Sequence, residues 1–300
     1  MSHPYLSRVA ARLRRSLGLD ELARRLDGIE SRLAGLNVDR YPYGPLYFGD
    51  HTALVATRWG AKMLVDTRDA MVSPWLVLDG LWESHVTDWL QHTLQPGQIF
   101  VDVGANIGYF TLLGGMLVGP QGRCVGIEAH PRLAELLQRN VIINGLHSHV
   151  TTWHRAAWSE ATELKLHMRR NFASNSSIGS IGPDALSRLG DTEKIVEVEA
   201  VRLDDLLADL PRVDVVKIDV EGAEVHVVTG LARILDANPT ITVMFEWSPA
   251  QITDVGDDPG SLVDLLMTHG FRFQHLETGL STIDRPALLA LPYGNVVAKR

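Results

Sequence analysis

Residues 100–111 constrain the fold of this chain more than any other segment, because an apolar run ends there in a glycine turn that opens an apolar helix. The sequence is FVDVGANIGYFT. A strand, a glycine turn and a helix in this order form the nucleoside-binding unit of doubly wound α/β folds. Gly104 and Gly108 are four residues apart, and Asn106 stands where a dinucleotide fingerprint has its second glycine. Because a side chain there keeps the backbone away from a pyrophosphate, the spacing favours a nucleoside without phosphates.

The charge balance and the cysteine content exclude several other classes of protein. The chain of 300 residues carries a formal net charge of -8, whereas a general nucleic-acid binder needs an excess of lysine and arginine. We therefore expect no nucleic-acid partner. Cys124 is the single cysteine, which excludes an internal disulfide and is typical of a reducing compartment. We expect a cytoplasmic protein.

The first 40 residues carry an amphipathic pattern. Apolar residues recur there at spacings of three and four, namely Leu19, Leu22, Leu26, Ile29, Leu33 and Leu36. This pattern predicts a helix over 19–36, which either docks on its own domain or forms a short coiled coil in a homodimer. Four arginines between residues 8 and 15 leave open a peripheral contact with the inner face of the membrane, besides an ordinary solvated helix face.

The rest of the chain alternates between strand and helix patterns. We expect an annex over 41–97, with strands at 52–57 and 62–66 and a helix at 81–94, and a nucleoside-binding domain over 98–300. Its expected strands are 98–103, 123–128, 150–155, 213–219, 240–246, 271–276 and 295–299, and its expected helices are 107–117, 131–144, 223–236 and 260–269. This alternation predicts an α/β fold with a mostly parallel, seven-stranded sheet and helices on both faces.

An insertion over 163–201 interrupts this alternation between the third and fourth strands. An expected strand pair at 163–168 and 195–201 brackets a polar loop that contains Asn171 and Asn175. These amides are candidate ligands of a polyhydroxylated substrate, although polar residues are typical of any exposed loop. The insertion is where we expect substrate specificity to reside.

Two acids accompany the glycine turn. Asp102 ends the first core strand, where its carboxylate either accepts hydrogen bonds from the turn or faces a ligand's ammonium group. Glu128 ends the second strand, which is the place of the acid that binds both ribose hydroxyls in Rossmann-type folds. Together with Gly104, Asn106 and Gly108, these acids predict a nucleoside site, and S-adenosylmethionine is the cofactor that we expect there.

A second cluster of acids follows the fourth strand, in the segment KIDVEGAE at 217–224. Asp219 and Glu221 lie where ligands bind in open α/β sheets, and Glu246 at the end of the fifth strand should project into the same crevice. A general base, a divalent-metal site and charges favoured by a helix dipole all remain open, and the dipole suits Glu224 best. We do not expect a metal. Lys217 either pairs with one of these acids or caps the edge of the sheet.

These motifs resemble the FkbM family of S-adenosylmethionine-dependent methyltransferases. The resemblance spans roughly residues 60–247 and adds two elements, the segment GLWE at 80–83 and the segment AAW at 156–158. It implies a class I, Rossmann-like methyltransferase fold, with Ala157 on the adenine side of the cofactor and Glu83 as a further site residue. The segment AHP at 129–131 departs from the Glu-Pro that is common in similar chains.

The resemblance implies O-methylation of a hydroxyl on a sugar, glycolipid, polysaccharide or secondary metabolite. In this hypothesis Asp219 or Glu221 orients or deprotonates a small-molecule or glycan acceptor. Further candidates for contact with the acceptor are Glu83, Asn171, Asn175 and Glu246. Two alternatives remain, an NAD-linked sugar oxidoreductase or epimerase and a non-catalytic scaffold with a vestigial nucleoside site. The missing G-x-G-x-x-G pattern counts against the first.

Overall fold

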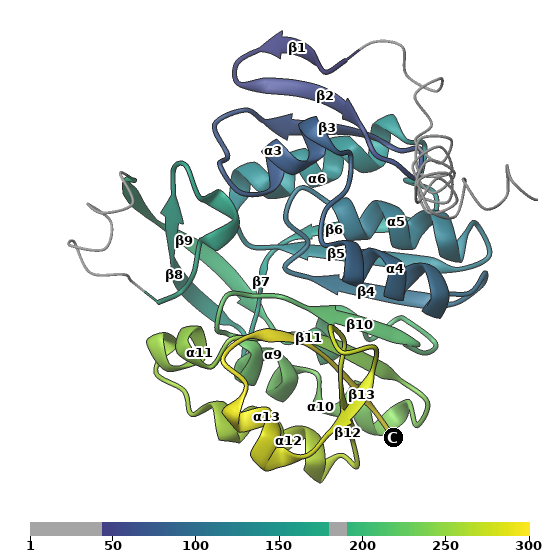
Figure 1. The fold of residues 1–300 in the computed structure, drawn as a ribbon, viewed down its shortest axis with the longest axis vertical. Helices are drawn as coiled ribbons and strands as arrows, with labels where there is room; N and C mark the ends of the chain where they lie inside the picture. The colour runs from purple at the N-terminus through teal and green to yellow at the C-terminus, as the bar shows by residue number, and fades with distance from the viewer. Residues whose placement is uncertain (1–43, 180–190) are drawn as a thin grey trace, which may run out of the picture. The chain divides into compact units, whose positions relative to one another are not determined.

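An eight-stranded sheet forms the centre of the computed structural model, which describes residues 44–179 and 191–300 (Figure 1). Its strand order is β13-β12-β14-β11-β10-β4-β5-β6. The strands are β4 (Ile99–Val103), β5 (Arg123–Glu128), β6 (Val150–His154), β10 (Val215–Ile218), β11 (Thr242–Trp247), β12 (Arg272–His275), β13 (Ser281–Ile283) and β14 (Gly294–Lys299). Strands β11, β10, β4, β5 and β6 are parallel, and β14, β12 and β13 continue the sheet antiparallel. The predicted mostly parallel fold is confirmed, and β13 is an additional short strand.

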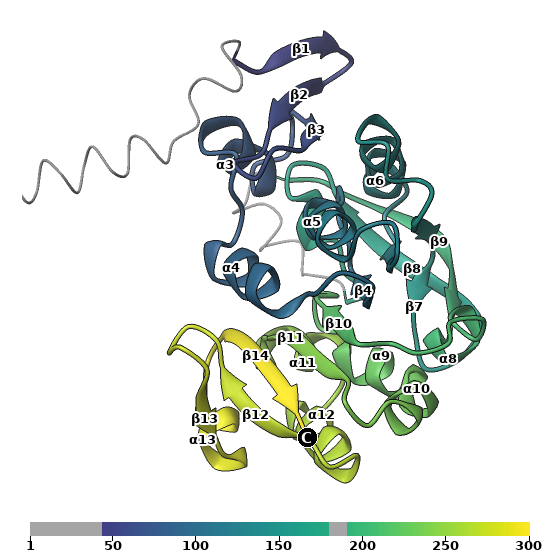
Figure 2. The ribbon, with the colours of Figure 1, turned by 90° about the vertical axis from the view of Figure 1, so that its right-hand side faces the viewer.

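Alternate residues of the central strands face two separate helical layers. Phe100, Cys124 and Met244 pack with α4 (Ser84–Thr93), α5 (Tyr109–Val118) and α6 (Pro131–Ile143). Val101 and Val216 belong to the opposite face, which packs with α8 (Leu203–Leu206), α9 (Glu224–Gly230), α10 (Ala232–Ala237) and α12 (Pro259–Thr268). Figure 2 shows the sheet between α5 and α9. Because successive strand side chains point to opposite faces, an unbroken apolar strand needs a helical cover on both.

The helices predicted between residues 81 and 269 are present, but the helix expected over 223–236 is divided. It consists of α9 and α10, which meet at Leu231. Gly230 lies so close to the carbonyl oxygen of Trp158 that a Cβ would be 2.1 Å from it. This close approach selects glycine, and glycine weakens a helix interior.

The annex is a small antiparallel sheet of β1 (Leu46–Gly49), β2 (Thr52–Ala56) and β3 (Lys62–Asp66), followed by α3 (Val72–Leu78). The predicted strands at 52–57 and 62–66 are confirmed, whereas β1 and α3 were not predicted. Asn140 of α6 joins this sheet to the core, because its amide accepts a hydrogen bond from Leu64 N at 2.6 Å and donates to Leu64 O and to Ile107 O.

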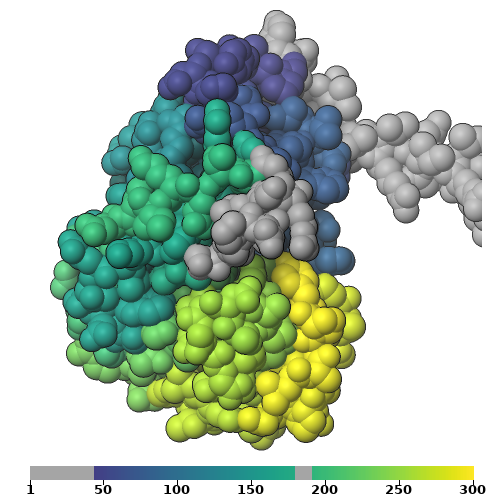
Figure 3. All heavy atoms as spheres, turned by 90° about the vertical axis from the view of Figure 1, so that its left-hand side faces the viewer, coloured from purple at the N-terminus to yellow at the C-terminus, as the bar shows by residue number. Residues whose placement is uncertain are grey.

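The insertion forms a third sheet, in which β9 (Glu193–Val201) lies between β8 (Thr162–Arg169) and β7 (Ala156–Ala157). A short 3-10 helix, η2 (Ala173–Asn175), follows β8. Figure 3 views the face on which this insertion lies between the annex and the C-terminal elements. Those elements include α11 (Pro249–Val255) and α13 (Arg285–Ala290).

The predicted N-terminal helix at 19–36 and the arginines at 8–15 lie outside the described residues. Within residues 44–179 and 191–300, every helix is too short or too polar to cross a membrane.

Candidate functional site

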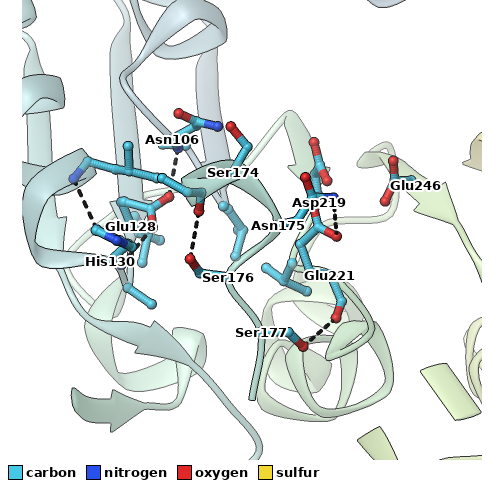
Figure 4. Close-up of a pocket in the computed structure, with 18 of the residues that line it drawn as sticks. Asn106, Glu128, His130, Ser174, Asn175, Ser176, Ser177, Asp219, Glu221 and Glu246 are labelled. Atoms are coloured by element: carbon cyan, nitrogen blue, oxygen red, sulfur yellow. Dashed lines mark hydrogen bonds between the residues drawn. The ribbon is translucent and has the colours of Figure 1, made fainter. Parts of the chain in front are cut away.

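A cavity of about 230 Å³ opens at the carboxyl ends of β4, β5, β10 and β11. Its walls come from the glycine turn after β4, the end of β5, β7, the segment around η2 and the turn after β10. Figure 4 shows Glu128 and His130 at one side of it and Asp219, Glu221 and Glu246 at the other. In an open α/β sheet this is the edge at which ligands bind.

The glycine turn is shaped by contact with its neighbours in the protein. Gly104 has a φ of +76°, and a Cβ on it would lie 1.7 Å from the carbonyl oxygen of Asp219. Gly108 has a φ of +93°, and a Cβ there would lie 2.6 Å from a methyl group of Leu137. At Gly104 a side chain would require the backbone to move, and at Gly108 it would be strained by the positive φ. Gly104 therefore lets the turn after β4 lie against the turn after β10, and Gly108 lets it lie against α6.

Glu128 lies where the sequence predicts the ribose-binding acid. One carboxylate oxygen accepts a hydrogen bond from the backbone N–H of Asn106 at 2.7 Å, and the other accepts one from His130 N at 2.7 Å. Burial raises the pKa of Glu128 to about 7. Each oxygen keeps a free lone pair, so the carboxylate can still accept two hydroxyl hydrogen bonds. Ala157, on β7, lines the same cavity.

Asp102 does not line the cavity, which contradicts its predicted contact with the cofactor. The side chain is fully buried and accepts a hydrogen bond from Thr111 Oγ1 at 2.6 Å. Its second oxygen lies 3.9 Å from Lys217 Nζ. Burial raises the pKa of Asp102 despite that cation. Asp102 is one residue short of the turn, so its side chain points into the layer between sheet and helix, where Lys217 needs a counter-charge.

Lys217 is central in the sheet, because β10 pairs with both β4 and β11. The alternative of a sheet-edge cap is therefore wrong, and pairing with an acid is confirmed. Its Nζ lies 2.8 Å from an oxygen of Asp219. Burial opposes its charge, but the carboxylates of Asp219 and Asp102 outweigh burial and raise the pKa of Lys217. The lysine thus holds Asp219 at the cavity wall.

Three carboxylates converge beside this pair. Asp219, Glu221 and Glu246 each offer an oxygen, and the three oxygens lie within 4.8 Å of one another. Burial, and then the charge of Asp219, raises the pKa of Glu221 to about 8 and that of Glu246 to about 9. Burial and Asp219 also raise the pKa of Glu83, which lines the same cavity, to about 7. Such a cluster can accept a proton from a substrate or hold a cation.

The insertion contributes one of its two predicted residues. Asn175 lines the cavity, and its amide donates to the carboxylate of Glu221 at 3.4 Å. Asn171 is not among the residues that line the cavity, and its contact with substrate stays a prediction. Its backbone N–H donates to Asp191 at 3.0 Å and its carbonyl accepts from Ala70 N at 2.8 Å. Asn171 therefore connects the insertion to the annex.

Further contacts fix the backbone and side chain of Glu221. Ser177 Oγ donates to its carbonyl oxygen at 2.9 Å, and Gln251 of α11 donates to its carboxylate. Glu221 itself has a φ of +55°, which is uncommon for a residue with a Cβ. Its neighbour Glu224 is buried and accepts weak hydrogen bonds from the N–H groups of Val220 and Gly222. This position at the start of α9 agrees with the dipole interpretation of Glu224.

Tyr293 and His130 are among the lining residues that were not predicted as site residues from the sequence. Tyr293 precedes β14, and its hydroxyl donates to Glu246 at 2.5 Å. It is 47 residues from Glu246 and meets it only because β14 pairs with β11, so no local pattern could reveal it. The sequence analysis noted His130 only as a member of the segment AHP at 129–131, which departs from the common Glu-Pro.

Comparisons with known proteins show which family this chain is similar to. Residues 102–273 match the family described as the methyltransferase FkbM domain. Methyltransferase sdnD of Sordaria araneosa is 31% identical over 183 residues, which cover 53% of this chain and 70% of that protein. The 31-O-demethyl-FK506 methyltransferase FkbM of Streptomyces tacrolimicus is 29% identical over 213 residues, or 61% of this chain and 76% of that protein. A solved O-methyltransferase of Bacillus cereus is 15% identical, with a TM-score of 0.41, over 73% of this chain and 80% of that one.

Proposed function

The chain belongs to the FkbM methyltransferase family, and from this premise we propose that it transfers a methyl group from S-adenosylmethionine to a hydroxyl group. The acceptor in this proposal is a sugar, a glycan or a secondary metabolite. The relative from Streptomyces tacrolimicus is named as a methyltransferase of an O-demethyl compound, which supports oxygen as the methylated atom. The observation that carries the proposal is that a nucleoside-type end and a cluster of acids share one cavity.

The end of the cavity beside Glu128, where the methyl donor would bind, fits an uncharged ribose and base. We call it the donor end. Glu128 is fixed by Asn106 N and His130 N, and its remaining lone pairs can accept both ribose hydroxyls. Asn106 has a side chain at the point where a dinucleotide site needs glycine, so a pyrophosphate lacks room. Ala157 leaves an apolar wall for the base. S-adenosylmethionine, when bound, supplies an electrophilic methyl group on a sulfonium centre.

At the other end, Asp219 is the residue to which we assign the acceptor proton. Its carboxylate lies at the cavity wall, and the ion pair with Lys217 fixes its direction. Lys217 Nζ lies 2.8 Å from Asp219 and 3.9 Å from Asp102, so two carboxylates share one positive charge and Asp219 can still accept a proton. Glu221 and Glu246 have raised pKa values and serve as hydrogen-bond partners that orient the acceptor. In this proposal the acceptor oxygen would form the new O–C bond as the S–C bond of the methyl donor breaks, which would release S-adenosylhomocysteine. The hydroxyl proton would pass to the Asp219 carboxylate.

Membership of a methyltransferase family does not support the NAD-linked alternative. A divalent cation at Asp219, Glu221 and Glu246 stays an open variant of the mechanism, because hard oxygen ligands suit such ions. The homodimer through 19–36 and the peripheral membrane contact also stay proposals, as do the cytoplasmic location and the absence of a nucleic-acid partner.

Calorimetric titration with S-adenosylhomocysteine and, separately, with NAD tests the donor end. We expect micromolar binding of S-adenosylhomocysteine, a loss of at least tenfold in Glu128→Gln, and no change in Glu163→Gln, which alters an exposed glutamate of β8. Binding of NAD alone would overturn the proposal. Binding of neither would favour the scaffold interpretation.

A further inference from the structure

His130 joins β5 to α6 and is only 7% exposed, yet it lines the cavity beside Glu128 (Figure 4). Its backbone N–H is the group that donates to Glu128. The imidazole is thus fixed at the donor end, next to the carboxylate assigned to the ribose.

The two ring nitrogens of His130 have different surroundings. Nδ1 accepts hydrogen bonds from Arg132 N at 3.1 Å and Leu133 N at 3.4 Å, at the start of α6. A nitrogen that accepts cannot carry the hydrogen of a neutral imidazole, so that hydrogen is on Nε2. Burial lowers the pKa of His130 to about 4, which keeps the ring neutral at neutral pH.

Nε2–H makes no hydrogen bond to any residue of 44–179 and 191–300. His130 lines a cavity that can hold a ligand, and its Nε2 is not one of the fully buried side-chain atoms that lack a partner. Nε2 is therefore open to the cavity, where a bound group can accept its hydrogen. A ribose hydroxyl that donates to Glu128 keeps two lone pairs of its own. One ribose hydroxyl can therefore donate a hydrogen bond to the Glu128 carboxylate and accept another from an N–H group.

We propose that Nε2–H of His130 donates a hydrogen bond to a ribose hydroxyl oxygen of the methyl donor and so positions the ribose beside Glu128. This inference rests on the proposed function, since it assumes that the cavity binds S-adenosylmethionine. It also explains the segment AHP at 129–131, which departs from the common Glu-Pro. The histidine supplies a hydrogen-bond donor to the ribose, which the carboxylate of Glu128 cannot do.

The variant His130→Asn separates this contact from the capping of α6. The asparagine Oδ1 is bonded to Cγ, as Nδ1 is, and it can accept from the same backbone N–H groups. Its side chain is too short to replace Nε2. We expect the thermal unfolding midpoint of the ligand-free variant to stay near that of the wild type, whereas His130→Ala lowers it through loss of the cap.

Binding is measured by calorimetry with S-adenosylhomocysteine and with its 2′-deoxy and 3′-deoxy analogues. We expect His130→Asn to weaken S-adenosylhomocysteine about fivefold, the usual effect of one neutral hydrogen bond. For the analogue that lacks the contacted oxygen, wild type and variant should bind equally. Equal affinities of wild type and variant for S-adenosylhomocysteine would overturn the inference. An equal loss with all three ligands would also overturn it, because the contact would not be to the ribose. If the wild type binds no S-adenosylhomocysteine, the proposed function fails first and the inference with it.

Discussion

At the scale of single residues, the charged group of Asp102, Lys217 and Asp219 leads to a prediction about activity. Asp219→Asn removes the proton acceptor, while Asp102 still balances Lys217. We expect methyl transfer to an identified acceptor to fall at least about 100-fold, with the affinity for S-adenosylhomocysteine unchanged within about twofold. Radiolabelled methyl transfer and calorimetry measure the two quantities. Asp209→Asn, on an exposed aspartate, is the control, and full activity of Asp219→Asn would remove Asp219 from the mechanism.

The raised pKa of Glu246 should make the stability of the fold depend on pH. Its pKa is about 9 in the folded protein and about 4.5 in the unfolded chain, because burial and the charges of Asp219 and Glu221 oppose ionisation. The folded state therefore binds the proton more tightly, and Glu246 increasingly destabilises the fold as pH rises from about 4.5 to 9. Glu246→Gln cannot ionise and can still accept from Tyr293.

We expect Glu246→Gln to unfold like the wild type at pH 5 and to be more stable at pH 8 by roughly 1–4 kcal/mol. Urea denaturation of the ligand-free protein at both pH values measures this difference. Glu163→Gln, which changes an exposed carboxyl of β8, should show no such trend. A stability gain that is equal at pH 5 and pH 8 would contradict the ionisation argument.

At the scale of elements, the glycine turn after β4 predicts an unusually costly substitution. Gly104→Ala places a Cβ 1.7 Å from the carbonyl oxygen of Asp219, at a φ of +76°. We expect it to lower the free energy of unfolding by about 3 kcal/mol or more and to abolish binding of S-adenosylhomocysteine. Gly145→Ala separates the two causes, because Gly145 has a φ of +69° with no atom within 4 Å of its Cβ. That control should cost only about 1 kcal/mol. Equal costs for both variants would show that the contact of Gly104 with the turn after β10 is unimportant.

The elements differ in how far their sequences predict them. The core strands were predicted because runs such as VMF at 243–245 are apolar on both faces. Helices α3, α11 and α13 were missed because six or seven residues are too few for a helical period. In the site, Glu128 and Asp219 were predicted because each stands at the end of a predicted strand, and this pattern can be read from neighbouring residues alone. Asp102 was misplaced because its burial depends on Lys217, which reaches it only through the pairing of β4 with β10.

At the scale of the whole molecule, the annex and the core share one apolar cluster. Met63 of β3 and Leu76 of α3 belong to the same buried cluster as Phe100 of β4 and Leu136 of α6. The annex also reaches the donor site, since α6 bonds to both β3 and the residue after Asn106. We therefore expect residues 45–300 to unfold in one cooperative transition.

Asn140 tests this coupling, because its buried amide joins Leu64 of the annex to Ile107 of the glycine turn. Asn140→Ala leaves buried backbone groups without partners, so we expect a loss of about 2–4 kcal/mol in unfolding free energy. The transition should stay single, and S-adenosylhomocysteine should bind more weakly because the turn that carries Asn106 N loses a support. Asn144→Ala is the matched control, since Asn144 makes similar bonds to Lys62 at an exposed edge and should cost less than about 1 kcal/mol. Urea denaturation followed by two probes, tryptophan fluorescence and far-ultraviolet circular dichroism, measures the effect. If the two probes report separate transitions in Asn140→Ala and ligand affinity is unchanged, then the annex is an independent unit and the donor site does not depend on it.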